Sequence, residues 1–157
     1  MEKVIEIRMA EDATGLAAVR ALFEEHWESF GFTPCFQNFG EEVAGLPGRY
    51  AGPDGRLAVA WAGEEAAGCV ALRKLDERRG EFKRLYVRPA FRGQGLGRRL
   101  VEWVMEQARG AGYAELVADT MPEMREALAL YEQMGFARTA AYADQATTGA
   151  VCIRKVL

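Results

Sequence analysis

Three glycines and two arginines stand together in the stretch from Arg92 to Arg98. Glycine lacks a Cβ and tolerates positive φ, so an anion can approach the backbone closely there. The helix expected to follow adds its unpaired N-terminal N–H groups and the positive end of its dipole. These residues therefore predict a binding site for phosphate or pyrophosphate.

Two common nucleotide-binding motifs do not fit this stretch. Gly93, Gly95 and Gly97 are each two residues apart, whereas the dinucleotide fingerprint is GxGxxG after an early strand. A P-loop needs Gly-Lys followed by Ser or Thr, which this chain lacks. For the glycines taken alone, a tight strand-to-helix turn without a ligand stays an alternative.

The elements around the turn follow from apolar patterning and breakers. Residues 82–87 form an apolar strand leading in, and residues 96–109 an amphipathic helix leading out. Short turns separate three strand-like segments before the turn, which predicts antiparallel pairing. Residues 113–119 are an expected strand parallel to residues 82–87, because a helix crosses over between them. The three earlier strands are residues 56–62, 66–75 and 81–87.

The remaining elements complete a single α/β domain, residues 1–157, with a mixed sheet. Asp12 or Thr14 is expected to cap a helix that continues to about Phe30. The other expected elements are a strand at 4–7, a short helix at 39–46 within irregular residues 31–55, a helix at 123–134, and a closing hairpin of 136–142 and 150–157.

Composition excludes several classes of protein. A net charge of −3 argues against a general nucleic-acid binder. The charged N-terminus resembles neither a signal peptide nor a membrane span. Three widely spaced cysteines predict neither a disulfide framework nor a zinc site. We therefore expect a cytoplasmic protein with reduced thiols and no metal.

Two segments carry a family resemblance. The sequence RGQGLG at residues 92–97, preceded by LYVRP at residues 85–89, resembles the acetyl-CoA-binding motif of the GNAT N-acetyltransferase superfamily. ALALYEQMGF at residues 127–136 resembles the second conserved block, in the family's order and spacing. The resemblance implies a GNAT fold, an α/β (α+β) domain whose mixed sheet of about six or seven strands has helices on both faces.

The resemblance also implies an acetyl-CoA site. The glycine turn would hold the CoA pyrophosphate, and the preceding strand would pair with the pantetheine arm while a backbone N–H polarises the thioester carbonyl. The chain departs from the family at Met124, where many relatives carry an asparagine that contacts the arm. The implied cofactor-binding residues are Leu85, Tyr86, Val87, Arg92, Gly93, Gln94, Gly95, Leu96, Gly97, Arg98 and Tyr131.

Two residues are the candidate proton carriers. Tyr131 is expected to protonate the leaving thiolate, given the family match and its phenolic pKa near ~10; the alternative is a core tyrosine. Glu81 is expected to take the acceptor's proton, directly or through water; the alternative is a solvated charge at a strand end. His26 is expected to be structural or on the surface.

The acceptor is expected to be a small primary amine or an amino-acid-like molecule, attacking directly in a ternary complex. Phe36 and Gln37, in the long irregular segment, are the candidate substrate-binding residues. A non-catalytic acyl-CoA-binding domain, a protein or peptide acceptor, a hydroxyl acceptor and a longer acyl group stay open. A homodimer is also consistent with the family resemblance.

Overall fold

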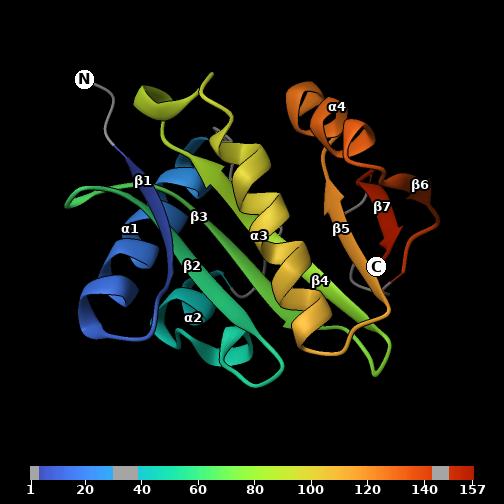
Figure 1. The fold of residues 1–157 in the computed structure, drawn as a ribbon, viewed down its shortest axis with the longest axis horizontal. Coiled ribbons are helices and arrows are strands. Elements are labelled where there is room, and N and C mark those ends of the chain that lie inside the picture. Colours follow the sequence, from blue (N-terminus) through green and yellow to red (C-terminus); the bar gives the residue numbers. More distant parts are fainter. Residues whose placement is uncertain (1–3, 30–38, 143–148) are drawn as a thin grey trace.

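A computed structural model describes residues 4–29, 39–142 and 149–157 (Figure 1). Their strands form one mixed sheet in the order β1-β2-β3-β4-β5-β7-β6. The strands are β1 (Ile5–Met9), β2 (Arg56–Ala62), β3 (Glu65–Lys74), β4 (Arg79–Val87), β5 (Glu115–Thr120), β6 (Ala137–Thr139) and β7 (Val151–Val156). The helices are α1 (Ala13–Ser29), α2 (Phe39–Ala44), α3 (Leu96–Gly110) and α4 (Arg125–Gln133), with short 3₁₀ turns at Gly48–Tyr50 and Pro89–Phe91.

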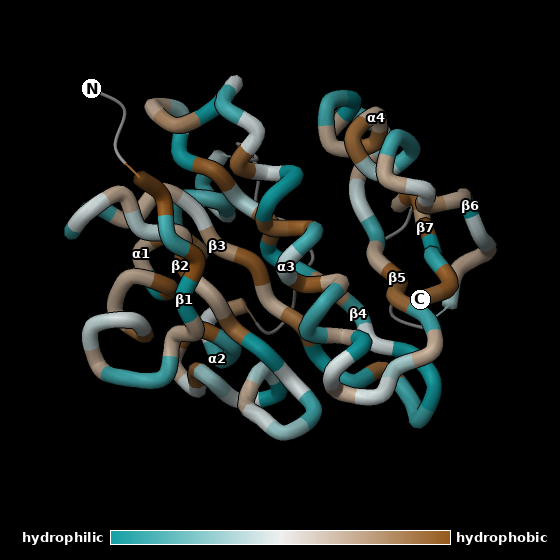
Figure 2. The backbone as a smooth tube through the Cα atoms, in the orientation of Figure 1, coloured by the Kyte–Doolittle hydropathy of each residue, from teal (hydrophilic) through white to brown (hydrophobic). Residues whose placement is uncertain are grey.

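The sheet separates two apolar layers. Helix α3 packs on one face, here called the α3 face, and α1 on the other, the α1 face (Figure 1). Neighbouring strand residues alternate between them, as pleating requires: Leu72 lies in the α3-face core and Ala71 in the α1-face core. The hydrophobic stretches of the central strands lie inside, while the turn between β3 and β4 is hydrophilic (Figure 2). The predicted single mixed sheet with helices on both faces is confirmed.

Strands β4 and β5 pair only at their beginnings. The parallel register joins Arg79, Gly80 and Glu81 to residues 115–117 and then ends. Just beyond that point β4 carries a bulge: Arg84 has φ 60° and the register with β3 shifts. Bulges bend a strand and redirect side chains. From residue 83 onward, the two strands therefore diverge.

Several element boundaries differ from the sequence-based expectation. Strand β4 begins at Arg79 because Gly80 already pairs with β3. Strand β5 begins at Glu115, and the backbone N–H of Ala114 instead bonds to the turn carbonyl of Arg78. Strand β6 is shorter than the expected residues 136–142 because only residues 137–139 pair with β7. Asp12 does cap α1: its Oδ1 accepts from the Gly15 N–H at 2.7 Å.

Candidate active site

The glycine turn has the open backbone that an anion site needs. Gly93 and Gly95 both have φ 78°, and an added Cβ at either position would meet no atom within 4 Å. The first N–H to enter the α3 ladder is that of Arg99, which donates to the Gly95 carbonyl at 3.1 Å. The N–H groups of residues 96–98 precede that bond, so helix geometry leaves them for a ligand. The predicted pyrophosphate cradle therefore fits this backbone.

The arginines near the glycine turn mostly form hydrogen bonds or ion pairs with other groups of the protein. The guanidinium of Arg88 forms a bidentate ion pair with the carboxylate of Glu25 in α1, with N–O distances of 2.5–3.0 Å. Arg92 Nε donates to the Val87 carbonyl at 2.9 Å. Arg98 pairs with Glu102 one helical turn further along, and both are exposed. The turn's capacity for an anion consequently lies more in its backbone N–H groups than in a free basic patch.

A cavity of about 120 Å³ opens where β4 and β5 diverge. One wall is apolar and belongs to the α3 face, while the opposite wall is polar and belongs to the α1 face. The apolar wall is Phe82, Leu85, Met124, Ala127 and Tyr131; the polar wall is His26, Lys83, Arg84 and Asp119; Thr120, Met121 and Ala150 complete the lining. The cavity between the strands thus has both an apolar and a charged lining.

Tyr131 lines the cavity with a buried ring. It is 5% exposed and packs edge-on against Phe82, with ring centroids 5.4 Å apart, and against Phe136 at 6.0 Å. Burial raises its pKa above that of an ordinary phenol, so it keeps its proton at neutral pH. No hydrogen bond engages its hydroxyl within the described residues. The hydroxyl is therefore available to a molecule in the cavity.

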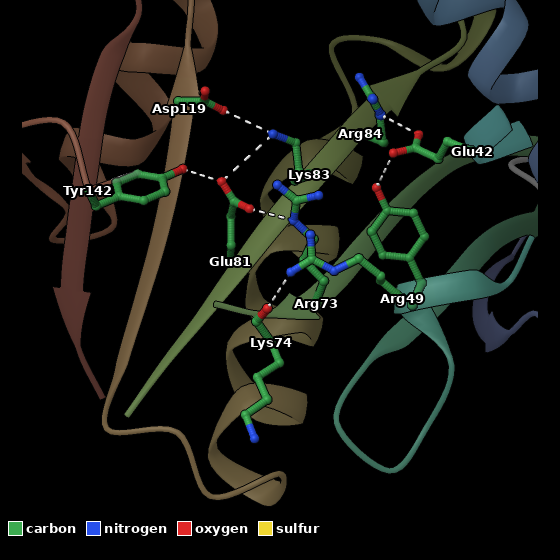
Figure 3. Close-up of polar contacts among 10 residues, drawn as sticks. Glu42, Arg49, Arg73, Lys74, Glu81, Lys83, Arg84, Asp119 and Tyr142 are labelled. Atoms are coloured by element: carbon green, nitrogen blue, oxygen red, sulfur yellow. Dashed lines mark hydrogen bonds and ion pairs between the residues drawn. The ribbon is translucent and has the colours of Figure 1, made fainter. Parts of the chain in front are cut away.

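Glu81 is buried within a charged network across β3, β4 and β5 (Figure 3). Arg73 Nε donates to its Oε1 at 2.6 Å, Tyr142 donates to its Oε2, and Lys83 Nζ lies 3.7 Å from Oε2. Burial acts to raise the pKa of Glu81, but the charges of Lys83 and Arg73 and the two hydrogen bonds outweigh it, so the pKa falls below its ordinary value.

This environment corrects one reading of Glu81 and leaves the other as a prediction. The solvated strand-end charge is wrong, because Glu81 is 2% exposed and lies inside β4. Glu81 is not among the lining residues of the cavity, whereas its neighbour in the network, Lys83, is. The role of proton acceptor is therefore one that Glu81 would perform through an intervening group or water.

Sequence reasoning missed the polar wall. His26 was expected to be structural or on the surface, yet it lines the cavity and stacks on Tyr86, with centroids 5.1 Å apart. Burial and the nearby charges of Arg84 and Arg92 lower its pKa to about 4, so it is neutral at pH 7. Asp119 ends the predicted strand, but no local pattern places it opposite β4. The packing of distant elements puts both in the wall.

The structure does not describe the two residues expected to bind the acceptor. Phe36 and Gln37 are outside the described residues. Of the strand residues expected at the cofactor, Leu85 lines the cavity, whereas the Tyr86 ring lies in the α1-face core. The Tyr86 side chain therefore supports His26, and only its backbone can face the opening.

Similarity to known proteins agrees with this geometry. A family model described as "Acetyltransferase (GNAT) family" matches residues 18–136. The chain belongs to the GNAT family. An uncharacterized N-acetyltransferase of Schizosaccharomyces pombe is 36% identical over 125 residues, covering 78% of this chain and 77% of the relative. The uncharacterized N-acetyltransferase YsnE of Bacillus subtilis is 32% identical over 136 residues, covering 85% and 87%.

Two solved acetyltransferase structures and one further sequence relative are also similar to this chain. A Streptococcus agalactiae acetyltransferase structure has a TM-score of 0.81 at 22% identity, covering 98% of each chain. YncA, a putative acetyltransferase of Salmonella typhimurium determined with acetyl-CoA, has a TM-score of 0.72 at 21% identity, covering 97% of this chain and 93% of its own. An IAA acetyltransferase of Azospirillum brasilense is 39% identical over 86 residues, covering 54% and 56%.

Membership of the GNAT family confirms the prediction of an acetyl-CoA-dependent N-acetyltransferase.

The described residues include no group of three or more His, Cys, Asp or Glu side chains able to hold a metal ion. None of the helices in the described ranges is both long and apolar enough to cross a membrane.

Proposed function

We propose that this GNAT protein moves the acetyl group of acetyl-CoA to the primary amine of a small molecule, by direct attack in a ternary complex. The observation that supports this most is the cavity between β4 and β5, with an apolar wall that carries Tyr131 and a charged wall opposite. Donor and acceptor could enter from opposite faces of the sheet and meet at the opening.

The donor would be held by backbone more than by side chains. The N–H groups of residues 93–98 would bind the pyrophosphate, whereas the Arg92 N–H already donates to the Pro89 carbonyl at 3.3 Å. The edge of β4 from residue 83 onward, which does not pair with β5, would pair with the pantetheine arm as an added strand. A β4 N–H near the bulge would then polarise the thioester carbonyl. Met124 lines the same cavity, so the arm would contact a thioether at the position where many relatives carry asparagine.

The proton transfers would use both walls. The acceptor ammonium loses one proton toward Glu81 through water, and the neutral amine attacks the carbonyl carbon. The N–C bond forms, the C–S bond breaks, and Tyr131 protonates the sulfur. The nitrogen's second proton returns to the Tyr131 phenolate through solvent. One acetyl amide, one free thiol and one released proton balance the reaction.

A small acceptor is favoured by the cavity volume of about 120 Å³ and by its lining of both apolar and charged residues. One GNAT relative is named IAA acetyltransferase, a name consistent with small-molecule chemistry. Phe36 and Gln37 remain proposed acceptor contacts, and cytoplasmic location and a homodimer remain predictions.

A screen of amines, amino acids and peptides with acetyl-CoA, following free thiol, tests the proposal. We expect thiol release that depends on a small primary amine. If the protein binds acetyl-CoA and no acceptor releases thiol, the non-catalytic acyl-CoA-binding domain is the correct reading. If only peptides release thiol, the small-molecule acceptor is wrong.

A further inference from the structure

Lys83 holds hydrogen-bonding capacity that its protein partners do not use. Its Nζ lies 3.5 Å from Asp119 Oδ1 and 3.7 Å from Glu81 Oε2 (Figure 3). A hydrogen bond between an ammonium and a carboxylate is normally near 2.8 Å. Glu81, by contrast, is bonded closely by Arg73 and Tyr142. Lys83 is therefore attracted by two carboxylates, and no described residue accepts a close hydrogen bond from it.

Lys83 and Asp119 both face the cavity. Both belong to its lining, and their side chains are 15% and 18% exposed. They come from β4 and β5 just beyond the last paired residues, Glu81 and Val117. A molecule at the charged wall would thus meet an ammonium from one strand and a carboxylate from the other, side by side.

The charges of this wall and its supporting network balance. Three positive charges belong to Arg73, Lys83 and Arg84, and three negative ones to Glu42, Glu81 and Asp119. Ion pairs connect Arg73, Glu81, Lys83 and Asp119, and a separate ion pair joins Arg84 to Glu42. His26 is neutral at pH 7. A ligand with one net charge would leave a partly buried charge uncompensated, which is costly. A zwitterion adds one charge of each sign and leaves the balance intact.

We propose that the acceptor is an amino carboxylate: a molecule with a primary ammonium and a carboxylate a few bonds apart, as in an amino acid. Lys83 binds the carboxylate, and Asp119 binds the ammonium before it loses its proton. This inference rests on the proposed function and narrows its substrate class. Acetylation removes the positive charge of the acceptor, so the product is an anion that Asp119 repels, which favours its release.

The test compares three acceptors with the same side chain: the best amino acid from a screen of the standard set, its carboxamide, and its decarboxylated amine. In the parent protein, we expect kcat/KM to be at least about tenfold higher for the amino acid than for the amine. Lys83→Met should lower kcat/KM for the amino acid by about 10- to 100-fold, as expected for a lost charge-assisted hydrogen bond. The same variant should change the values for the amide and the amine by less than about threefold.

Two further variants sharpen the test. Asp119→Asn should lower kcat/KM for all three acceptors, because all three share the ammonium. Lys74→Met is the matched control: Lys74 lies on β3 and its Nζ bonds Glu77 at 2.6 Å, outside the cavity lining. We expect Lys74→Met to leave the order of the three acceptors unchanged.

The outcomes separate this inference from the proposed function. An equal loss for all three acceptors in Lys83→Met would make Lys83 a structural residue and overturn the inference. Acetylation of amines but of no amino acid would keep the proposed function and reject the inference.

If nothing is acetylated, calorimetry decides: amino acids are titrated into CoA-saturated parent protein and into the CoA-saturated Lys83→Met variant. Binding lost in the variant supports the inference without the enzyme, and no binding to the parent refutes it.

Discussion

Tyr131 combines a protonated hydroxyl with a fixed ring. Its packing against Phe82 and Phe136 holds the ring at the cavity, and burial keeps the phenol protonated. Tyr131→Phe keeps that packing and removes only the hydroxyl group, which carries the proton. We expect turnover to fall by roughly 10²-fold or more, a typical effect of losing a general acid, with little change in CoA affinity. Steady-state thiol release and calorimetry measure the two quantities.

Tyr113→Phe is the matched control for this variant. The Tyr113 hydroxyl donates to the Asp54 carbonyl at 2.7 Å, away from the cavity, so its loss should leave turnover nearly unchanged. If Tyr131→Phe turns over a productive acceptor as fast as Tyr113→Phe does, Tyr131 is a core residue and not the acid.

Glu81 links pH to stability. Its pKa in the folded protein is below the ordinary value of 4.5. The carboxylate therefore contributes stability that is fully present above pH 4.5 and is lost as the pH falls through the lower folded value. Glu81→Gln should lower the free energy of unfolding at pH 7 by about 3 kcal/mol, because it leaves the partner Arg73 incompletely paired. Urea unfolding at several pH values should show the difference shrinking below pH 4.5.

The same variant tests the proposed proton acceptor. Under conditions where Glu81→Gln is folded, the acidic limb of its pH profile for kcat/KM should be flatter than in the parent protein. An unchanged profile, together with the expected loss of stability, would make Glu81 purely structural.

Single residues differ in how far the sequence predicts their setting. The sequence singles out Tyr131 through the family resemblance of its segment, and the structure puts it in the cavity lining, while its role as the acid stays a prediction. The burial of Glu81 was not predictable, because its partners Arg73 and Tyr142 lie 8 and 61 residues away. Arg84 adopts positive φ without being glycine, so residue type gives no signal for the bulge. The polar wall depends on that bulge and on α1 packing.

At the scale of elements, the start of α3 is the predicted phosphate site. Gly95→Glu adds bulk and negative charge at the open N-terminus of the helix. We expect CoA affinity to fall by about 30-fold or more, since an anion site loses both space and favourable charge. Calorimetric titration of CoA into the folded variant measures the loss.

Helix α3 offers a matched control at its other end. Gly112 also has positive φ, 91°, and open space around an added Cβ. Gly112→Glu imposes similar backbone strain and the same charge beyond the C-terminus of the helix. It should leave CoA affinity unchanged; equal losses in both variants would mean that strain, and not the turn, causes the effect.

Element order and element geometry were not equally predictable. The order of strands and helices, and the parallel pairing of β4 with β5, follow from hydrophobic periodicity and crossover rules. The point at which this pairing ends does not, because β4 continues as a strand to Val87 and β5 to Thr120, beyond that point. That end point, at Glu81 and Val117, creates the cavity.

At the scale of the whole molecule, the donor should stabilise the fold. Acetyl-CoA at about 100 times its Kd should add about 2.7 kcal/mol to the free energy of unfolding. For a domain of 157 residues, that corresponds to a rise in Tm of roughly 5–10 °C. Thermal scans with increasing acetyl-CoA measure the rise. At the same acetyl-CoA concentration, Gly95→Glu should reduce the rise to about a third or less, and a parent protein with an unchanged Tm would argue against a donor site.

In the proposed reaction, donor and acceptor meet at the β4–β5 opening and react directly. Initial rates with both acetyl-CoA and the best acceptor varied, and the acetylated product identified by mass, test it most directly. Direct transfer in a ternary complex should give intersecting double-reciprocal lines and one acetylated amine for each thiol released. Parallel lines, or an acetyl group carried on the protein between the two half-reactions, would contradict it.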